Sequence, residues 1–121
     1  MKDLRKFYID GQWVDPIQSN DLPVENPANE ELVATISLGA AADVNLAVAA
    51  ARRAFLGFSQ TSVDERIALM EKLLQIYIDR YDEMAVAISI EMGAPISFAT
   101  AAQADCGRGH NNAALEALKQ F

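Results

Sequence analysis

The sequence predicts a mainly α-helical fold, in which about four helices follow N-terminal β-hairpins. In the first third of the chain, clusters of turn residues separate short β-prone runs. Beyond it, apolar residues recur at steps of three and four, which is typical of one face of an α-helix. We therefore expect β-hairpins over residues 5–38 and a helical layer over residues 41–121.

The first hairpin is predicted around Asp10-Gly11, which separates two β-prone runs. Asp-Gly is a strong hairpin signal because both central positions of the tight turn need a positive φ. A second hairpin is predicted around residues 26–30, where proline and asparagine favour a turn. Pro23 cannot donate a ladder hydrogen bond, so we place its strand at a sheet edge.

Two long helices are predicted next. The first covers about residues 41–58, and its alanines favour a helix intrinsically. The second begins at Ser62 with a capping box. In such a box the Ser62 hydroxyl accepts from the Glu65 N–H, and the Glu65 carboxylate accepts from the backbone N–H of Ser62. The apolar rows on these helices are Val44, Val48, Ala51, Phe55 and Phe58; then Val63, Ile67, Met70, Leu74, Tyr77 and Tyr81; and a further row of Leu69, Leu73 and Ile76.

Two more helices complete the prediction. After a break around residues 79–82, a short helix runs to Met92, and Gly93 ends it as a left-handed C-cap. A last helix is expected over residues 96–118. Gly107 and Gly109 lie inside it, and each costs up to about 1 kcal/mol relative to alanine. We therefore expect close packing or a kink at these glycines.

Composition excludes several classes of protein. Apolar residues make up 51% and charged residues 22%, a balance typical of soluble globular proteins. The net charge of −7 argues against nucleic acid or an anionic membrane as a partner. No apolar run is long enough to span a membrane, and no secretory signal pattern is present. A single cysteine, Cys106, fits a reducing cytoplasm.

Four motifs, in this order, resemble the start of the aldehyde dehydrogenase superfamily. They are F-Y-I-D-G-Q-W at residues 7–13, V-E-N-P-A-N-E at residues 24–30, the helix A-D-V to R-R-A-F at residues 42–55, and the stretch from Arg66 to E-M-G-A-P at residues 91–95. The resemblance covers about residues 5–121. It departs at Glu30, where the family often has Gly, and at Ala94, where it often has Lys.

The resemblance implies an α/β parent enzyme, of whose cofactor-binding domain residues 1–121 form the N-terminal part. Such an enzyme oxidises an aldehyde to a carboxylic acid with NAD or NADP through a thioester. The family's nucleophilic Cys, general-base Glu, oxyanion-stabilising Asn and cofactor-binding glycines lie beyond the matched segment. We therefore assign no catalytic or cofactor-binding residue here. We expect this chain alone to be inactive and to bind no cofactor.

Cys106 is the only thiol, and His110 follows it on the same predicted helix face. We interpret Cys106 as a small helix residue, because Cys–His dyads usually join residues distant in sequence. The resemblance implies a different role, since Ala102 and Cys106 match positions that line the family's substrate entrance. Two small residues there predict a wide entrance, and ordinary helix packing is the alternative.

The resemblance also implies a structural monovalent-cation site. In many family members an acid matching Glu91 and backbone carbonyls near Val24 and Glu25 hold the ion. A further ligand comes from beyond the matched segment. The alternative is a solvated carboxylate near a helix C-terminus.

Two interpretations remain open. The chain is either the N-terminal fragment of an NAD(P)-dependent aldehyde dehydrogenase or a non-catalytic helical interaction module from a truncated gene product. In both cases the broad apolar rows need more cover than two hairpins supply. We expect the remainder of the enzyme or a second copy of the chain to provide it.

Overall fold

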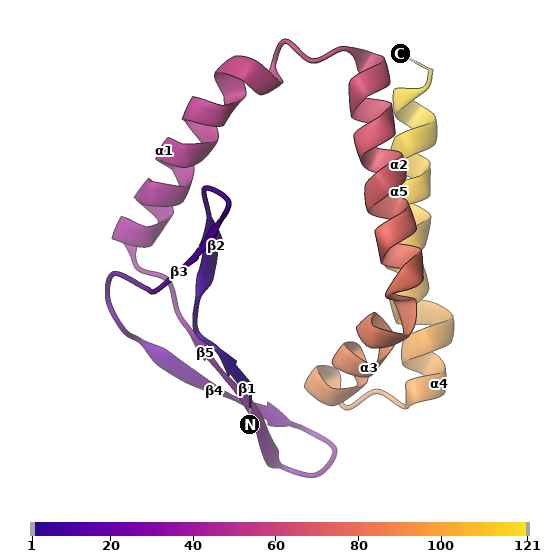
Figure 1. Cartoon of the computed structure of the whole chain (residues 1–121). Helices are drawn as coiled ribbons and strands as arrows, with labels where there is room; N and C mark the ends of the chain where they lie inside the picture. Colours follow the sequence, from indigo (N-terminus) through magenta and orange to yellow (C-terminus); the bar gives the residue numbers. More distant parts are fainter. Residues whose placement is uncertain (1, 121) are drawn as a thin grey trace. The chain divides into compact units, whose positions relative to one another are not determined.

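The computed structural model of this chain describes residues 2–120. By their internal contacts the residues fall into two units, Met1–Gln60 and Thr61–Phe121. The strands and the first helix make up the first unit, and the remaining helices make up the second (Figure 1).

The first predicted hairpin is confirmed. Strands β2 (Phe7–Ile9) and β3 (Gln12–Val14) pair antiparallel. Asp10 has a φ of 55° and Gly11 a φ of 77°, as a tight turn with two left-handed residues requires. Tyr8 lies opposite Trp13, and their ring centroids are 5.3 Å apart. Both rings are largely exposed, so they pack across the hairpin and not in a core.

The second hairpin belongs to a three-stranded sheet. Strands β4 (Asp21–Asn26) and β5 (Glu31–Ser37) pair antiparallel, and β4 forms one edge, so the placement of Pro23 is confirmed. The other edge is β1 (Lys2–Leu4), which pairs parallel to β5. The sequence did not predict β1, because its partner β5 is distant along the chain and the pairing leaves no local signal.

Helix α1 (Ala41–Phe58) has the predicted bounds and runs beside β2 (Figure 1). Ala50 is buried, and the Arg53 guanidinium pairs with the Asp10 carboxylate at 2.8 Å. The predicted apolar stripe is not buried within this unit. Its larger members are at least 46% exposed, and these are Val44, Val48, Phe55 and Phe58. Asp43 and Ala50 are the buried residues of α1.

Helix α2 (Val63–Asp79) begins as predicted. The Glu65 N–H donates to Ser62 Oγ at 3.2 Å, and the Ser62 N–H donates to Glu65 Oε2 at 2.7 Å. The chain breaks at Arg80, and α3 (Tyr81–Met92) follows. Gly93 has a φ of 69°, which confirms the left-handed C-cap.

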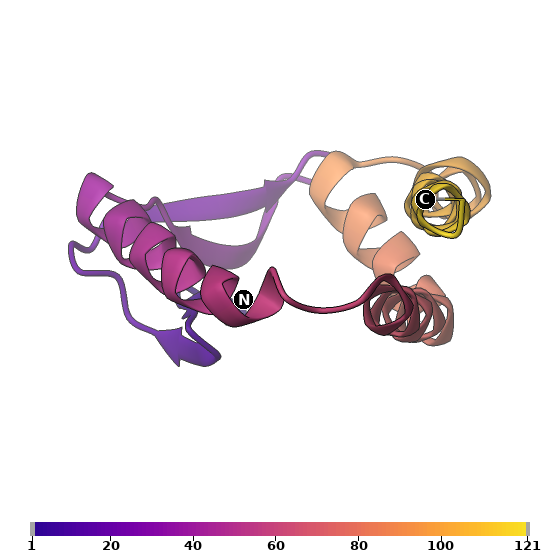
Figure 2. The same cartoon turned by 90° about the horizontal axis from the view of Figure 1, so that it is seen from above.

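The predicted last helix is continuous but not uniform. It starts as α4 (Ile96–Phe98), passes through the π-helical turn η1 (Ala99–Gln103) and continues as α5 (Ala104–Leu118). Helix α5 lies along α2, and Figure 2 shows the two nearly end-on, side by side. The predicted helix over 96–118 is therefore confirmed, with a π-helical turn inside it. The distortion lies at residues 99–103, upstream of the two glycines where a kink was expected.

The core of the second unit is small. Ala85, Ala99, Ala104 and Leu115 are its buried apolar residues within the described chain. The first predicted row of α2 is half-buried from Ile67 onward, whereas Leu69, Leu73 and Ile76 are 55%, 54% and 46% exposed. Helix α2 thus has one apolar face on α5 and a second that no described residue covers. No helix formed by residues 2–120 is long and apolar enough to cross a membrane.

Candidate functional site

The last helix holds the residues that the sequence assigned to a substrate entrance. Cys106 is exposed and Ala102 is half-buried. Ala102 lies within η1, so the spacing between the two residues crosses the junction of a π-helical turn with an α-helix. Their assignment to an entrance stays a prediction.

No hydrogen bond links the Cys106 thiol to another of the residues 2–120, His110 included. The polar neighbours of Cys106 are engaged elsewhere. Arg108 pairs with Asp105 at 2.5 Å, and Asn111 Nδ2 donates to the Gly107 carbonyl at 2.8 Å. A nucleophilic thiol needs a base within hydrogen-bond reach, and this arrangement provides none for Cys106.

Two tyrosines contact the backbone of this same helix. Tyr81 Oη donates to the Thr100 carbonyl at 2.5 Å, and Tyr77 Oη donates to the Ala104 carbonyl at 2.8 Å. Burial, followed by the negative charge of Asp105, raises the pKa of Tyr81. The hydroxyl therefore keeps the proton that it donates. In the sequence both tyrosines belong to one predicted apolar row, which gives no signal for these bonds to distant carbonyls.

Gly107 is a close-approach glycine, as expected. A Cβ on it would lie 2.6 Å from Cζ of Tyr77, which real side chains do not tolerate. For Gly109 the expectation is wrong, since a Cβ there would meet nothing within 4 Å. The tyrosine ring thus explains one of the two helix glycines.

The residues of the predicted cation site lie in different units. Glu91 is exposed in the last turn of α3, whereas Val24 and Glu25 flank a register shift in β4. Among residues 2–120, no three His, Cys, Asp or Glu side chains gather in a group that could hold a metal ion. A single exposed acid is a weak ligand set, so the site stays a prediction.

Asp43 is a buried carboxylate that the sequence analysis did not single out. Its Oδ1 accepts from the Ile17 N–H at 2.9 Å, and its Oδ2 accepts from the Ala40 N–H at 2.8 Å. These two bonds, the first above all, lower the pKa of Asp43. An acid in the first turn of a predicted helix was the available signal, but the partner Ile17 is distant in sequence.

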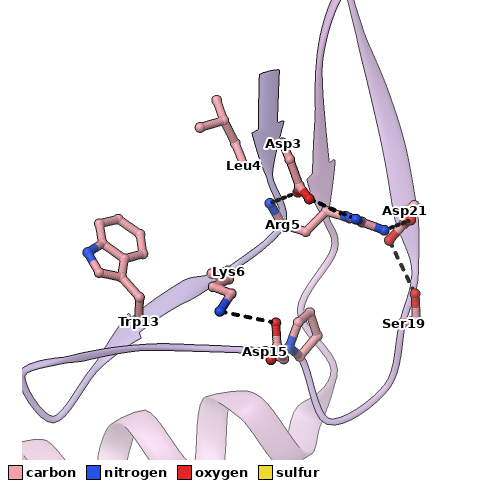
Figure 3. Close-up of a pocket in the computed structure, with 9 residues that line it drawn as sticks. Asp3, Leu4, Arg5, Lys6, Trp13, Asp15, Ser19 and Asp21 are labelled. Carbon is pink, nitrogen blue, oxygen red and sulfur yellow. Dashed lines mark hydrogen bonds and ion pairs between the residues drawn. The ribbon is translucent and has the colours of Figure 1, made fainter. Parts of the chain in front are cut away.

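The first unit also carries a pocket beside β1 (Figure 3), lined by Asp3, Leu4, Arg5, Lys6, Trp13, Asp15, Pro16, Ser19 and Asp21. Arg5 lies between Asp3 and Asp21, with guanidinium–carboxylate distances of 2.8 and 3.2 Å. The hydrogen bonds from Arg5 lower the pKa of Asp3 to about 2. Lys6 pairs with Asp15 at 3.8 Å. The charged side chains of this pocket pair with one another, so they do not require a ligand.

Comparison with known proteins explains this architecture. The family model for the aldehyde dehydrogenase family matches residues 13–120. The chain belongs to the aldehyde dehydrogenase family. Across its whole length it is 48% identical to a 3-succinoylsemialdehyde-pyridine dehydrogenase from Pseudomonas sp. and 40% identical to a putative aldehyde dehydrogenase from Staphylococcus aureus. It spans 26% of the length of each of these two proteins.

Solved aldehyde dehydrogenases have the same fold over this segment. The Bartonella henselae enzyme matches 100% of the chain and 25% of its own, with a TM-score of 0.97 and 45% identity. Aldehyde dehydrogenase C from Pseudomonas syringae, solved with NAD+ and octanal, matches 97% of the chain and 24% of its own, with a TM-score of 0.93 and 45% identity. The α/β parent fold is therefore confirmed, and so is the location of this segment at the N-terminal quarter of its relatives.

Glu30 differs from the residue that the resemblance predicts at its position. Glu30, which stands where aldehyde dehydrogenases often have Gly, adopts a φ of 60°. A positive φ is costly for a residue with a Cβ and free for glycine. A glycine at position 30 would therefore suit the backbone of the turn between β4 and β5.

Proposed function

We propose that this chain acts as the N-terminal part of an NAD(P)-dependent aldehyde dehydrogenase, in which it forms a layer of the cofactor-binding domain. The observation that carries the proposal is similarity along the entire chain to enzymes of which it spans about a quarter. The exposed row of Leu69, Leu73 and Ile76 supports it, because an apolar row beside a packed one needs a further layer to cover it.

In this proposal the catalytic groups lie in the other three quarters of the enzyme. Thioester chemistry needs an activated thiolate, donors for the oxyanion and a bound nicotinamide cofactor. The exposed Cys106 lacks a hydrogen-bonded base among the described residues, so we assign it no chemical step. NAD or NADP would bind the complete enzyme, which we place in the cytoplasm.

We further propose that Ala102 and Cys106 contribute to the wall of the substrate entrance. Cys106 is exposed on α5, and both side chains are small. Replacing Cys106 with Trp should then raise KM for bulky aldehydes more than for small ones. Equal kinetics on both would remove this assignment and leave the family role of the segment intact.

The main proposal is tested by complementation. The chain is expressed alone, and also together with the segment of the Pseudomonas sp. relative that follows the region matched here. With an aldehyde and NAD+, we expect NADH formation from the pair and none from either part alone. If the chain alone forms NADH and Cys106→Ser abolishes this, the assignment of catalysis to the remaining segment is wrong.

A second candidate function is self-association without catalysis. It is favoured by the exposed apolar residues on both α1 and α2, of which Phe55 at 65% and Leu56 at 76% are the most exposed large ones on α1. The two candidates differ in one measurement. A self-association module forms dimers that persist when the complementary dehydrogenase segment is added. A dehydrogenase segment instead dissociates from its own copies and binds that complementary segment.

A further inference from the structure

The last helix of the second unit contains a π-helical turn. In the π-helical turn η1, the Ala104 N–H bonds to the Ala99 carbonyl, five residues back. Such turns are rare, and they occur mostly as single turns, often at functional sites. A carbonyl in such a turn loses its usual i+4 donor and accepts instead from the i+5 N–H, or gains support from a donor outside the helix.

The support comes from two phenol hydroxyls. Tyr81 Oη donates to the Thr100 carbonyl within η1, and Tyr77 Oη donates to the Ala104 carbonyl at its end. The two accepting carbonyls are four residues apart along the helix. The hydroxyls therefore fix the turn at both ends.

The rings are themselves held in place. Tyr77 and Tyr81 meet edge to face, with centroids 6.3 Å apart and planes at 84°. Tyr77 lies so close to the helix that a Cβ at position 107 would overlap its ring, and Gly107 provides the space. Ala99 and Ala104 are fully buried. Small residues thus allow the tyrosines to reach the backbone.

The turn decides which residues α5 exposes. One extra residue in a helix changes the orientation of everything after it by about 100°, because a regular turn takes 3.6 residues. In the observed phase Ala104 and Leu115 are buried and Cys106 is exposed. A regular α-helix from Ile96 onward would present a different set.

We propose that Tyr77 and Tyr81 are positioning residues: their hydroxyls hold the π-helical turn, and this turn sets the side chains that α5 presents as a wall of the aldehyde entrance. The link to the entrance rests on the proposed function. The link between the hydroxyls and the turn does not.

The first test removes the hydroxyls from the full chain. In Tyr81→Phe, and more strongly in the Tyr77→Phe/Tyr81→Phe double variant, we expect the amides of residues 100–106 to exchange with solvent roughly 5- to 10-fold faster. Tyr8→Phe, on the exposed hairpin, is the matched control and should change nothing there. Unchanged exchange in both tyrosine variants, with native circular dichroism, would overturn the proposal.

The second test reads the phase of α5 directly. Cys106 is the only cysteine, so a single nitroxide label reports on its surroundings. We expect the spectral line shape to change in the double variant and in Gly107→Ala, where the new Cβ displaces Tyr77. It should stay constant in Gly109→Ala, since position 109 has open space. If the line shape changes in proportion to the loss of overall stability of each variant, and not with the loss of the tyrosine contacts, a positioning role is contradicted.

Kinetics then separate the two halves of the inference. In the complemented dehydrogenase, Tyr81→Phe should change KM for bulky aldehydes at least about threefold while kcat for a small aldehyde stays constant. If exchange and line shape respond but this KM ratio does not, the entrance half is wrong. If the complemented enzyme is inactive with the unaltered chain, the proposed function fails, and the exchange and label data still decide the role of the tyrosines.

Discussion

Two residues other than glycine adopt a positive φ in the described chain, Asp10 at 55° and Glu30 at 60°. Aspartate tolerates this region because its short side chain bonds locally, and the Asp10 carboxylate also pairs with Arg53. Glu30 has no comparable compensation from its side chain. Its backbone N–H donates to the Asn26 carbonyl at 2.8 Å, so the turn holds it in the left-handed region.

Glu30→Gly should therefore stabilise the first unit. Glycine removes a left-handed penalty of about 1–2 kcal/mol but adds freedom to the unfolded chain, so we expect a net gain of about 0.5–1 kcal/mol. Urea unfolding followed by circular dichroism measures the gain. Glu30→Ala removes the same charge and keeps the Cβ, so it should give no gain. Equal stabilisation by both variants would show that charge, and not backbone conformation, is responsible.

At the same scale, Gly107 and Gly109 form a matched pair within one helix. Gly107→Ala should destabilise the chain, because Tyr77 must move away from the Ala104 carbonyl to admit the methyl group. Gly109→Ala should stabilise it by up to about 1 kcal/mol, since alanine is the better helix former and space is available. Thermal unfolding of the two variants checks this, and a shift of the same sign in both would contradict the account.

At the scale of elements, Asp43 ties the start of α1 to the loop before β4. It accepts hydrogen bonds from one backbone N–H on each side, so the helix and the loop share a single anion. The N-terminal end of a helix also favours negative charge. The Ser62–Glu65 capping box does a similar task for α2, but only within its own four residues.

Asp43 should make the stability of the first unit depend on acid pH. Its pKa is lower in the folded chain than in the unfolded chain. The unfolded state therefore binds more protons in the window below about pH 4, and stability falls as pH drops through the folded pKa. Above that window the contribution is fully present.

Asp43→Asn tests this. One of the two N–H donors would then face an amide NH2, so the variant should be less stable than the parent chain at neutral pH. It should also lose less stability between pH 5 and 2, a window about the pKa of the unfolded aspartate. Urea titrations across this range give the slope. Asp64→Asn, an exposed acid in the first turn of α2, is the control and should leave the slope nearly unchanged. An Asp43→Asn slope equal to that of the parent chain would sink the idea.

At the scale of the whole molecule, apolar surface exceeds what the described residues cover. The exposed stripe of α1 and the row of Leu69, Leu73 and Ile76 on α2 are each regular helical faces. Faces of this kind on a separate chain favour association. In the proposed dehydrogenase, the rest of the polypeptide covers them.

The isolated chain should therefore self-associate through these faces. Leu73→Glu should lower the association constant about tenfold or more, because it places a charge in the centre of the α2 row. Gln75→Glu adds the same charge on the polar side of α2 and is the control. Light scattering coupled to size exclusion measures the mass. A clean monomer of the parent chain, with no binding of a dye specific for apolar surface, would count against the prediction.

Local sequence determined most of the secondary structure. The Asp10-Gly11 turn, the Ser62 capping box and the Gly93 C-cap each depend on residues within about four positions of one another, so pattern and propensity suffice. The family could also be predicted from the sequence, because four motifs in order extend over nearly the whole chain.

Only the tertiary structure showed the contacts between residues that are distant in sequence. The bond from Ile17 to Asp43 spans 26 positions, and those from Tyr77 and Tyr81 to the last helix span 27 and 19. The π-helical turn and the pairing of β1 with β5 likewise have no local signal. Periodicity shows that a face is apolar, but not what covers it. The sequence by itself therefore predicted the helices and their family, whereas only the packing revealed how the tyrosines hold the turn before α5 and which face of α2 remains open.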